Sequence, residues 1–410
     1  MYDVLIVGAG ISGLRTAELL SEAGLDVIVL EKKETVGGSF GESLQGFPIY
    51  QYRKLDFEIP SYPAKNFTIR TGVDTKITFE FDKPLIRIVK RGSDDSTIDS
   101  FLLKKAIKAG AEVRFSSNVE KINLSTDIAE TFTADGKRFA SRIVVGADGV
   151  FSAVRRLGGF TKLPVRGIGY IAKMKNLKLN PLEIIITLNY KIAPMAYGYI
   201  VGYPEGPYST FGLTLRPEYV NKPVKEYFEK FRTYLKDVTD SSEIVDHFIG
   251  FVTCGDGRQQ VVKLNSILTG EAGGFQDPIA GFGMTPALLS AKIASEVIKK
   301  AVKNSDIKIL EEYAYLTKKE LIDSEIKKTW RIRKFILESL TNKELEIVVK
   351  LIGTNPTFIE KAIAGGEYSK VIRKVVAQAI VARPTILLLP FRYIFREIFG
   401  APKVSPEPSD

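Results

Sequence analysis

Residues 2–13 read YDVLIVGAGISG, a short apolar run followed at once by a glycine-rich turn. The run predicts a buried parallel strand over Tyr2–Val7. Gly8 permits a tight turn, Gly10 lets the backbone approach a pyrophosphate, and Gly13 lets the following helix pack on the strand. The stretch therefore predicts the opening strand, turn and helix of a dinucleotide-binding fold.

The next residues complete that unit. A helix is expected over 11–23, ended by Gly24, and a second strand over 26–30. The first residues of the helix, Ile11 and Ser12, offer N–H groups and a positive dipole end to phosphates. Glu31 follows the second strand, 23 residues after Gly8, where a carboxylate accepts a hydrogen bond from a ribose hydroxyl.

A second segment, RIVVGADGVFSAVR at 142–155, reads as a strand, a glycine-bounded acid and a new helix. It resembles the Ala-Asp-Gly stretch of flavoprotein hydroxylases and related reductases, which lies near the cofactor. The resemblance implies that Asp148 and Gly149 contact FAD. Read on its residues alone, Asp148 can equally cap the new helix.

A third segment begins with SILTGEAGG at 266–274. It resembles the third flavin motif, normally Gly-Asp-Ala, in which the acid holds the ribityl hydroxyls. Here Gly270 precedes Glu271, whose side chain is one methylene longer. The three segments in this order imply FAD as the cofactor.

DPIAGFGMTP follows at 277–286. Gly281 and Gly283 leave room for a planar ring against backbone. Thr285 reads as a helix N-cap and Pro286 as the first helical residue. In the family this helix points at the flavin, where its positive end stabilises charge on the reduced ring. The cofactor residues predicted in all are Gly8, Gly10, Ile11, Ser12, Gly13, Glu31, Lys32, Gly41, Arg91, Val119, Asp148, Gly149, Gly270, Glu271, Gly281, Phe282, Gly283 and Met284, with no metal ligand.

Bulk properties narrow the class of protein. The 410 residues allow two or three packed units, and one cysteine excludes an internal disulfide and suits a reducing cytoplasm. We expect no signal peptide and no membrane span. The composition is consistent with a thermophile. The net charge of +10 comes without a nucleic-acid motif, which favours attraction to an anionic membrane over nucleic-acid binding.

The predicted fold class is α/β (α+β), a Rossmann-like FAD-binding domain with an antiparallel-sheet substrate domain and a C-terminal helical region. Because the cofactor segments are dispersed, the FAD domain must be discontinuous. We expect residues 1–160 and 256–305 to form the FAD-binding domain, with 46–90 partly in the substrate sheet. Residues 161–255 are expected to form that sheet. Residues 306–400 should form the helical region, and 401–410 a disordered tail.

One strand pattern bears on the substrate. YIVGYP at 199–204 is followed by seven residues, 205–211, and then by Gly212. The geranylgeranyl reductase family carries Tyr-x-Trp-x-Phe-Pro, seven residues and Gly, so the segment resembles that motif with Val201 for Trp and Tyr203 for Phe. Tyr199, Val201 and Tyr203 share one strand face. The substrate pocket is therefore predicted to comprise Tyr199, Val201, Tyr203, Pro204, Gly212 and Phe282; the same face can also be ordinary core.

The resemblance covers nearly all of the chain. It implies a reductase of carbon–carbon double bonds in geranylgeranyl chains of archaeal-type ether lipids or their precursors. Hydride would come from reduced flavin N5, so no protein residue is assigned as catalytic, and the electron donor would be ferredoxin or NAD(P)H. A flavin monooxygenase of apolar substrates shares the FAD segments, and a non-catalytic prenyl carrier is a third reading.

Several residues depart from the family or stay open. Many members have a cysteine where Phe40 stands, so a thiol proton donor is absent there. Cys254 is expected to be buried and structural, and His247 to lie on the outer side of the sheet. Arg91 lies either near the cofactor or on the surface.

The tail from 371 to 399 alternates apolar pieces with arginines and contains Pro384 and Pro390. It suits either a segment lying in a membrane interface or helices packed on the body with their arginines outward.

Overall fold

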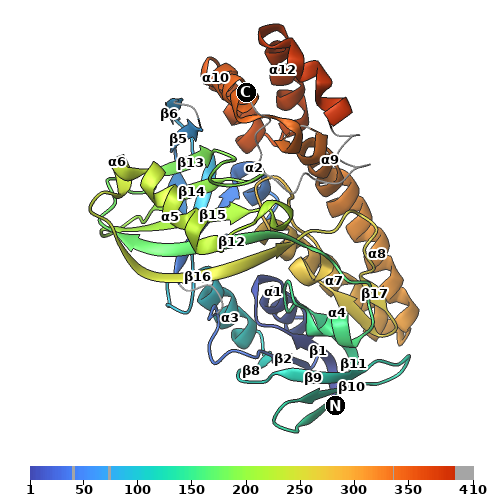
Figure 1. The fold of residues 1–410 in the computed structure, drawn as a ribbon. Helices are drawn as coiled ribbons and strands as arrows, with labels where there is room; N and C mark the ends of the chain where they lie inside the picture. The colour runs from blue at the N-terminus through green and yellow to red at the C-terminus, as the bar shows by residue number, and fades with distance from the viewer. Residues whose placement is uncertain (39–41, 73–74, 336, 393–410) are drawn as a thin grey trace.

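The computed structural model describes residues 1–38, 42–72, 75–335 and 337–392. It contains two large sheets, one small sheet and a helical region that follows them in the chain (Figure 1). The expected α/β class, with a Rossmann-like unit, a second sheet and C-terminal helices, is confirmed.

The first sheet has the order β17-β18-β11-β1-β2-β8, with β10 and β9 continuing antiparallel from β11. Strands β18, β11, β1, β2 and β8 run parallel, as the buried apolar run at the N-terminus predicts. The strands are β1 (Tyr2–Val7), β2 (Val27–Leu30), β8 (Glu112–Arg114), β9 (Val119–Asn123), β10 (Ala129–Thr133), β11 (Arg138–Gly146), β17 (Val262–Lys263) and β18 (Ser266–Leu268).

Alternate residues of β1 enter different cores. Val4 and Ile6 pack with helices on one face, whereas Leu5 and Val7 pack with the β9–β10 side on the other. This two-residue period is that of a strand buried on both faces. The helices around this sheet are α1 (Ile11–Ser21), α3 (Ile98–Lys108), α4 (Ala153–Leu157) and α7 (Met284–Asn304), with the 3₁₀ turn η2 (Gly270–Gly273).

The second sheet has the order β16-β12-β15-β14-β13-β5-β6. All neighbours are antiparallel except β13 and β5, which run parallel. Two of its strands thus come from the first ninety residues, ahead of the main stretch. The strands are β5 (Asn66–Thr71), β6 (Lys76–Glu80), β12 (Val165–Lys175), β13 (Ile184–Leu188), β14 (Gly198–Gly202), β15 (Tyr208–Leu215) and β16 (Glu243–Thr253).

One face of this sheet is covered by α5 (Val224–Tyr234), followed by α6 (Lys236–Thr239) and preceded by η1 (Pro217–Tyr219). Phe228 and Phe231 are fully buried there. The other face packs on the small sheet β3-β7-β4 and on Phe282. The small sheet comprises β3 (Ser43–Pro48), β4 (Tyr62–Ala64) and β7 (Ile86–Arg91), with the short helix α2 (Ile49–Tyr52).

The C-terminal region continues from α7 along the side of the molecule and ends beyond the second sheet, where α10 and α12 lie together (Figure 1). Part of it is wound as a π-helix (η4 and η6). Its elements are η3 (Ile307–Leu310), α8 (Glu311–Thr317), η4 (Lys318–Ile326), α9 (Lys327–Phe335), η5 (Leu337–Ser339), α10 (Asn342–Gly353), α11 (Thr357–Ile359), η6 (Glu360–Ala364), α12 (Tyr368–Ala382) and η7 (Pro384–Leu388). The tail predicted to be disordered, 401–410, lies outside the described residues.

Candidate functional site

A cavity of about 510 Å³ opens at the carboxyl ends of β1 and β2. In parallel sheets, this edge is where ligands bind. Four residues predicted to contact the cofactor, Gly8, Lys32, Val119 and Asp148, line it together. The sequence did not single out the other wall residues, which are Val7, Leu30, Ser117, Asn118, Glu120, Phe151, Ala153 and Arg156.

The three glycines of the first motif have different physical roles. Gly8 has a φ of +104°, and a Cβ there would lie 2.5 Å from the carbonyl oxygen of Ala147. A Cβ on Gly13 would lie 2.0 Å from the carbonyl oxygen of Gly8. A Cβ on Gly10 would meet nothing closer than 3.9 Å. Packing therefore demands glycine at 8 and 13, whereas at position 10 the space stays open for a ligand.

Glu31 fixes the glycine turn through its two carboxylate oxygens. One accepts the N–H of Ala9 at 2.8 Å, and the other accepts the N–H of Lys33 at 2.9 Å. Each oxygen has a second lone pair for a further donor. The carboxylate therefore stands oriented beside the turn, where the ribose contact is predicted.

Asp148 both caps a helix and faces the cavity. Its Oδ2 accepts the N–H groups of Ala153 and Val154 at 2.6 and 3.1 Å, while Ser152 caps the same helix. Its Oδ1 is buried without a partner in the described structure, and burial raises the pKa of the carboxyl. The capping alternative thus describes one oxygen, and the other remains available for a ligand.

The third motif packs directly on the first. A Cβ on Gly270 would lie 2.6 Å from Oγ of Ser12 in α1, and the N–H of Gly270 donates to Oγ of Ser290 in α7 at 2.9 Å. The neighbouring Glu271 accepts the N–H of Thr253 at 3.1 Å. Burial raises the pKa of Glu271 to about 7, so this carboxylate is costly to charge in the ligand-free protein.

The loop from 277 to 283 is ordered by polar contacts of its own. Asp277 accepts the N–H of Ala280 at 2.7 Å, and the Gln276 amide donates to the carbonyl of Gly281 at 2.8 Å. Gly281 has a φ of +70° and is exposed.

Helix α7 begins at Met284 with Gly283 as its N-cap, so the predicted cap at Thr285 is wrong. Thr285 and Pro286 lie in the first turn, where a missing N–H costs nothing. The Thr285 hydroxyl is buried without a partner in the described structure.

These features fit FAD. Two buried polar atoms without partners, Asp148 Oδ1 and Thr285 Oγ1, belong to the second and third motifs. The open space at Gly10 and the N-termini of α1 and α7 add donors for phosphate and for an electron-rich ring. Gly149, with a φ of +75° and no atom within 4 Å of its Cβ position, leaves similar room.

Arg91 is buried, so the surface alternative is wrong. Its guanidinium binds both carboxylate oxygens of Asp99, at 2.8 and 2.9 Å, and the side chain of Gln45 at 2.9 Å. Contact between Arg91 and the cofactor stays a prediction. Gly41 and Phe40 lie outside the described residues.

The Tyr…Gly spacing of the substrate motif has a geometric cause. Tyr199 on β14 lies directly opposite Gly212 on β15. A Cβ on Gly212 would lie 2.2 Å from the Tyr199 ring. The ring therefore covers the glycine across the strand pair, which fixes both residue types.

The rest of this strand face is packed. Val201 is 5% exposed and Tyr203 is 7% exposed, in a cluster with residues of the small sheet. Tyr199 and Phe282 border the same cluster and keep part of their surface accessible. Ordinary core packing thus accounts for Val201 and Tyr203 in the ligand-free chain, and their substrate contact stays a prediction, as does that of the half-buried Pro204.

Tyr197, which sequence reasoning missed, joins the two halves of the site. Its hydroxyl donates to the carbonyl of Ala280 in the loop before α7. The contact spans 83 residues, so no local pattern signals it.

The only cysteine and the only histidine of the chain are not assigned to the site. Cys254 is buried and its thiol faces the carbonyl of Gln276 at 3.0 Å; burial raises its pKa to about 12. His247 is exposed on β16 and stacks on Tyr170.

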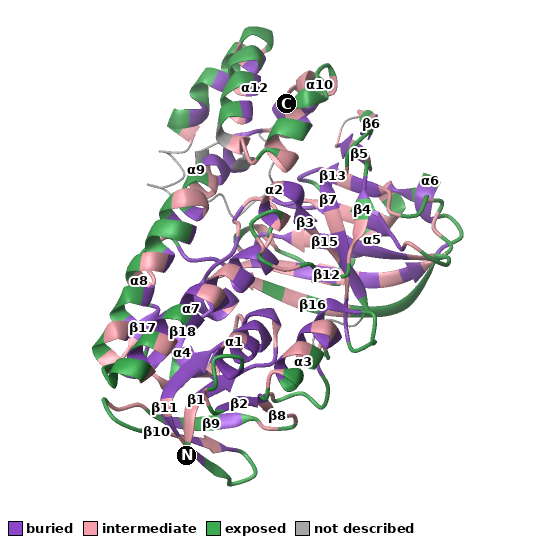
Figure 2. Cartoon of the chain, turned by 180° about the vertical axis from the view of Figure 1, so that it is seen from behind, coloured by how far each residue is buried: buried purple, intermediate pink, exposed green. Residues whose placement is uncertain are grey.

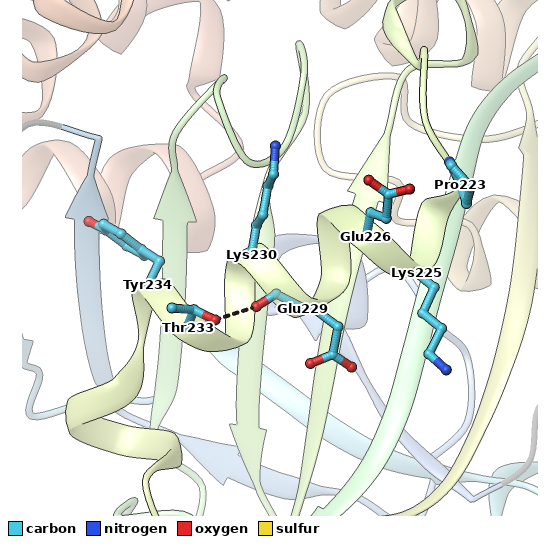
Figure 3. A pocket seen from close by; sticks show the side chains of 7 residues that line it. All are labelled: Pro223, Lys225, Glu226, Glu229, Lys230, Thr233 and Tyr234. Carbon is cyan, nitrogen blue, oxygen red and sulfur yellow. Dashed lines mark hydrogen bonds between the residues drawn. The ribbon is translucent and has the colours of Figure 1, made fainter.

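A second hollow lies on the outer side of α5 and contains none of the predicted site residues. Figure 3 shows its lining, in which lysine and glutamate side chains extend away from the helix and Thr233 donates to the carbonyl of Glu229. The inward side of α5 is packed on the sheet. This hollow is a solvated helix face, remote in the fold from the cofactor motifs. Its residues are Pro223, Lys225, Glu226, Glu229, Lys230, Thr233 and Tyr234.

Known proteins match this arrangement. A family model for NAD(P)-binding Rossmann-like domains matches residues 6–52. A digeranylgeranylglycerophospholipid reductase from Methanocella arvoryzae is 26% identical over 402 residues, covering 94% of this chain and 97% of the relative. A protein from Methanosphaera stadtmanae named digeranylgeranylglycerophospholipid reductase 3 is 27% identical over 385 residues, covering 87% and 92%.

The chain resembles the geranylgeranyl reductases along nearly its whole length. Among solved structures, a geranylgeranyl bacteriochlorophyll reductase-like protein from Thermoplasma acidophilum superposes with a TM-score of 0.80 at 21% identity, covering 94% of this chain and 99% of the other. That match shows a common fold that extends to the C-terminal helices.

A C-terminal side chain holds the loop that this reductase-like fold places before α7. Arg333 of α9 is buried and donates to the carbonyls of Pro278 and of Met195, the latter at 2.9 Å. Its Nε donates to Glu338 at 3.1 Å, and Glu338 also pairs with Arg216 at 3.2 Å. One guanidinium thus joins the loop, the approach to β14 and the C-terminal region.

Substitutions at Gly10 and Gly13 should separate ligand binding from packing. Gly13→Ala is expected to lower the free energy of unfolding by about 1–3 kcal/mol, because its Cβ has no room. Gly10→Ala should leave the free energy of unfolding nearly unchanged and reduce the FAD content of the purified protein. Chemical denaturation and flavin absorbance measure the two effects. Normal FAD content in Gly10→Ala would contradict the assignment of that space to the cofactor.

The raised pKa of Glu271 predicts a pH dependence in the FAD-free protein. The folded carboxyl keeps its proton up to a pH of about 7, whereas the unfolded one loses it near 4.5. The folded state therefore binds more protons between these values, so stability falls as pH rises through the window, by at most about 3 kcal/mol. Thermal unfolding from pH 4 to 8 measures this. Glu271→Gln should flatten the profile, and the exposed control Glu58→Gln should keep it.

Arg333→Met should lower the free energy of unfolding by about 3–5 kcal/mol, because it leaves Glu338 with fewer buried partners and frees two carbonyls. It should also speed FAD release, since the loop before α7 loses its tether. The matched control is Arg70→Met, which removes another buried arginine paired with Asp237 at 2.6 Å. Stopped-flow flavin fluorescence distinguishes them: equal release rates in the two variants would refute a tether.

Proposed function

We propose that this protein is an FAD-dependent reductase that saturates carbon–carbon double bonds of geranylgeranyl chains in archaeal-type ether lipids or their precursors. The observation that carries the proposal is the similarity over 94% of the chain to a protein named digeranylgeranylglycerophospholipid reductase. The Tyr199–Gly212 pair, which corresponds to the family's substrate motif, supports it independently.

The residues of the site would act by binding and orientation. FAD, when bound and reduced, supplies a hydride equivalent to an alkene carbon. The glycine turn, Glu31 and Asp148 would hold its nucleotide half, and Glu271 with the loop before α7 would hold its ring half. Tyr199 and Phe282 offer apolar surface beside that loop, which suits a polyprenyl chain without polar handles.

The proton that completes the reduction has candidate donors near the predicted substrate face. The Cys254 thiol faces backbone carbonyls and its raised pKa keeps it protonated, which favours a structural role. The Tyr199 hydroxyl, whose pKa burial raises to about 12, is a neutral O–H beside the predicted substrate face. Its acidity in that setting is low, so solvent admitted with the substrate is the alternative donor.

The proposed partners are an isoprenoid lipid, an external electron donor that is ferredoxin or NAD(P)H, and a membrane reached peripherally through residues 371–399. We place the protein in the cytoplasm, as its single cysteine favours. A monooxygenase of apolar substrates would share the cofactor site; the relatives named above are reductases, which supports the reductase.

Mass spectrometry tests the reaction. Anaerobic protein reduced with dithionite and incubated with a geranylgeranyl lipid in detergent should raise the lipid mass by two hydrogens for each saturated bond. NADPH-driven oxygen uptake with a hydroxylated lipid would instead establish the monooxygenase. A colourless protein without flavin absorbance would favour a non-catalytic carrier.

Tyr199→Ala should lower turnover of the long-chain lipid at least about tenfold while FAD stays bound, because the ring is the accessible apolar group opposite Gly212. Tyr203→Ala should impair turnover less than Tyr199→Ala, since Tyr203 is packed into the core. Comparison of lipid reduction with flavin content in each variant measures this. Unchanged turnover in Tyr199→Ala would show that the substrate face is misplaced.

A further inference from the structure

The last described turns of the chain carry apolar side chains on their outer face. Leu387, Leu388 and Phe391 are 58%, 49% and 70% exposed, and Val381 at the end of α12 is 84% exposed. The first three lie at positions i, i+1 and i+4 of a helical run, so they share one face. These three residues and Val381 are named here the C-terminal apolar patch.

The inner face of the same run is already occupied. Ile386 and Leu389 are 1% and 6% exposed and pack in a core cluster with Leu340, Leu345 and Ala379. The segment is therefore apolar on both sides, unlike a helix that merely covers a core. The outer face needs a second apolar environment, which marks an interaction site.

Charge indicates which environment this is. Tyr368–Arg392 contains five Lys or Arg residues and no Asp or Glu. Arg383 donates to the hydroxyl of Thr385 at 3.2 Å and has no carboxylate partner among the described residues. Lys374, which lies earlier in helix α12, is also exposed. Cations next to an apolar face match an anionic lipid surface, in which lysine and arginine reach the headgroups.

The same charge argues against a second copy of this chain. Arg392 is paired with Glu344 at 2.7 Å and Lys370 with Glu367 at 3.4 Å. Two such patches face to face would still bring Arg383 and Lys374 of both copies together, and like charges in contact are destabilising. Among the described residues, no helix has the length and apolar content of a membrane span.

The patch also has a functional position. The cluster beneath it includes Tyr190 and borders Met195, both on the connection from β13 to β14, and it also borders Leu188 at the end of β13. Strand β14 carries Tyr199 of the predicted substrate face. Figure 2 shows α12 with extensive exposed surface, projecting from the body beyond the second sheet. A surface that contacts this outer face would bind the segment whose inner side packs on the connection into the substrate strand.

We propose that the C-terminal apolar patch inserts into the interface of an anionic lipid bilayer, with Arg383 and Lys374 against the headgroups. The proposal rests on the proposed function in one respect, that the substrate is a membrane lipid. It narrows the contact from the whole of 371–399 to the outer face of 384–392 with Val381. The inner side of α12, with Val375 and Ala379 buried, packs on the body.

Vesicle flotation tests the patch with the full-length, FAD-loaded protein. The protein should float with vesicles of equal parts phosphatidylglycerol and phosphatidylcholine, and much less with phosphatidylcholine alone. The triple variant Leu387→Gln, Leu388→Gln, Phe391→Gln should bind the anionic vesicles at least about tenfold more weakly. Arg383→Gln with Lys374→Gln should weaken binding most at low salt.

A matched control replaces three equally exposed apolar residues elsewhere: Ile107→Gln, Val245→Gln and Ile249→Gln, which are 54%, 49% and 52% exposed in the parent. This control should float like the parent. Equal flotation of the parent and the patch variant, or no flotation of the parent on anionic vesicles, would overturn the proposal. A concentration-dependent dimer lost in the patch variant, without vesicle binding, would assign the face to a second copy.

Reduction of a geranylgeranyl lipid dispersed in detergent separates this proposal from the proposed function. The patch variant should retain that activity and lose it on vesicles, because detergent delivers the lipid without a bilayer. If the parent reduces nothing in detergent, the proposed function fails while flotation still decides the docking surface.

Discussion

The site depends on the close approach of two backbones, the turn at Gly8 and the strand end at Ala147. No side chain fits between them, since a Cβ on Gly8 would lie 2.5 Å from the Ala147 carbonyl. This contact places Asp148, the next residue, beside the glycine turn. Gly270 extends the same principle by packing against Ser12. Three segments that are far apart in the chain can therefore pack closely because glycines lack side chains at the contacts. Gly8 and Asp148, from the first two segments, line one cavity.

Close packing against a glycine also explains the Tyr and Gly positions of the substrate motif. The family's Tyr and Gly, thirteen positions apart here, are a directly opposed cross-strand pair. The tyrosine ring fits only because the opposite residue is glycine, and this contact does not depend on which residues lie between the two in sequence. This accounts for why both persist while Val201 and Tyr203 depart from the motif: their side chains pack into a cluster in which volume and apolarity are sufficient.

The sequence predicts well whatever is local. The strands at 2–7 and 26–30, the positions of Glu31 and Asp148 and the glycine turn follow from short-range geometry, so their sequence patterns predict them. The prediction was wrong at Thr285. Thr-Pro has the sequence of a helix N-cap, but the preceding loop, held by the hydrogen bond from Gln276 to Gly281, lets the helix begin at Met284. It assigned 161–255 to the second sheet but did not resolve strand β12 within that range.

Long-range polar contacts were beyond prediction. Arg333 meets Pro278 across 55 residues, and Tyr197 meets Ala280 across 83. In sequence, Arg333 is one cation in a basic helix and Tyr197 one aromatic among many. Only the fold shows that both end on carbonyls of the loop between Asp277 and Gly283, and that the surface alternative for Arg91 fails because Asp99 binds it in the interior.

These contacts give the C-terminal region a physical connection to the chemistry. Arg333 binds the loop before α7 on one side and Met195, at the approach to β14, on the other. Met195 also borders the cluster beneath the C-terminal apolar patch. A bilayer that orders this patch would therefore act on the connection from β13 to β14, which Arg333 also contacts. Since a ligand shifts an equilibrium only by its differential affinity for two states, lipid docking would influence the site only if it favours the tethered loop, and Arg333 is the residue through which that preference would be expressed.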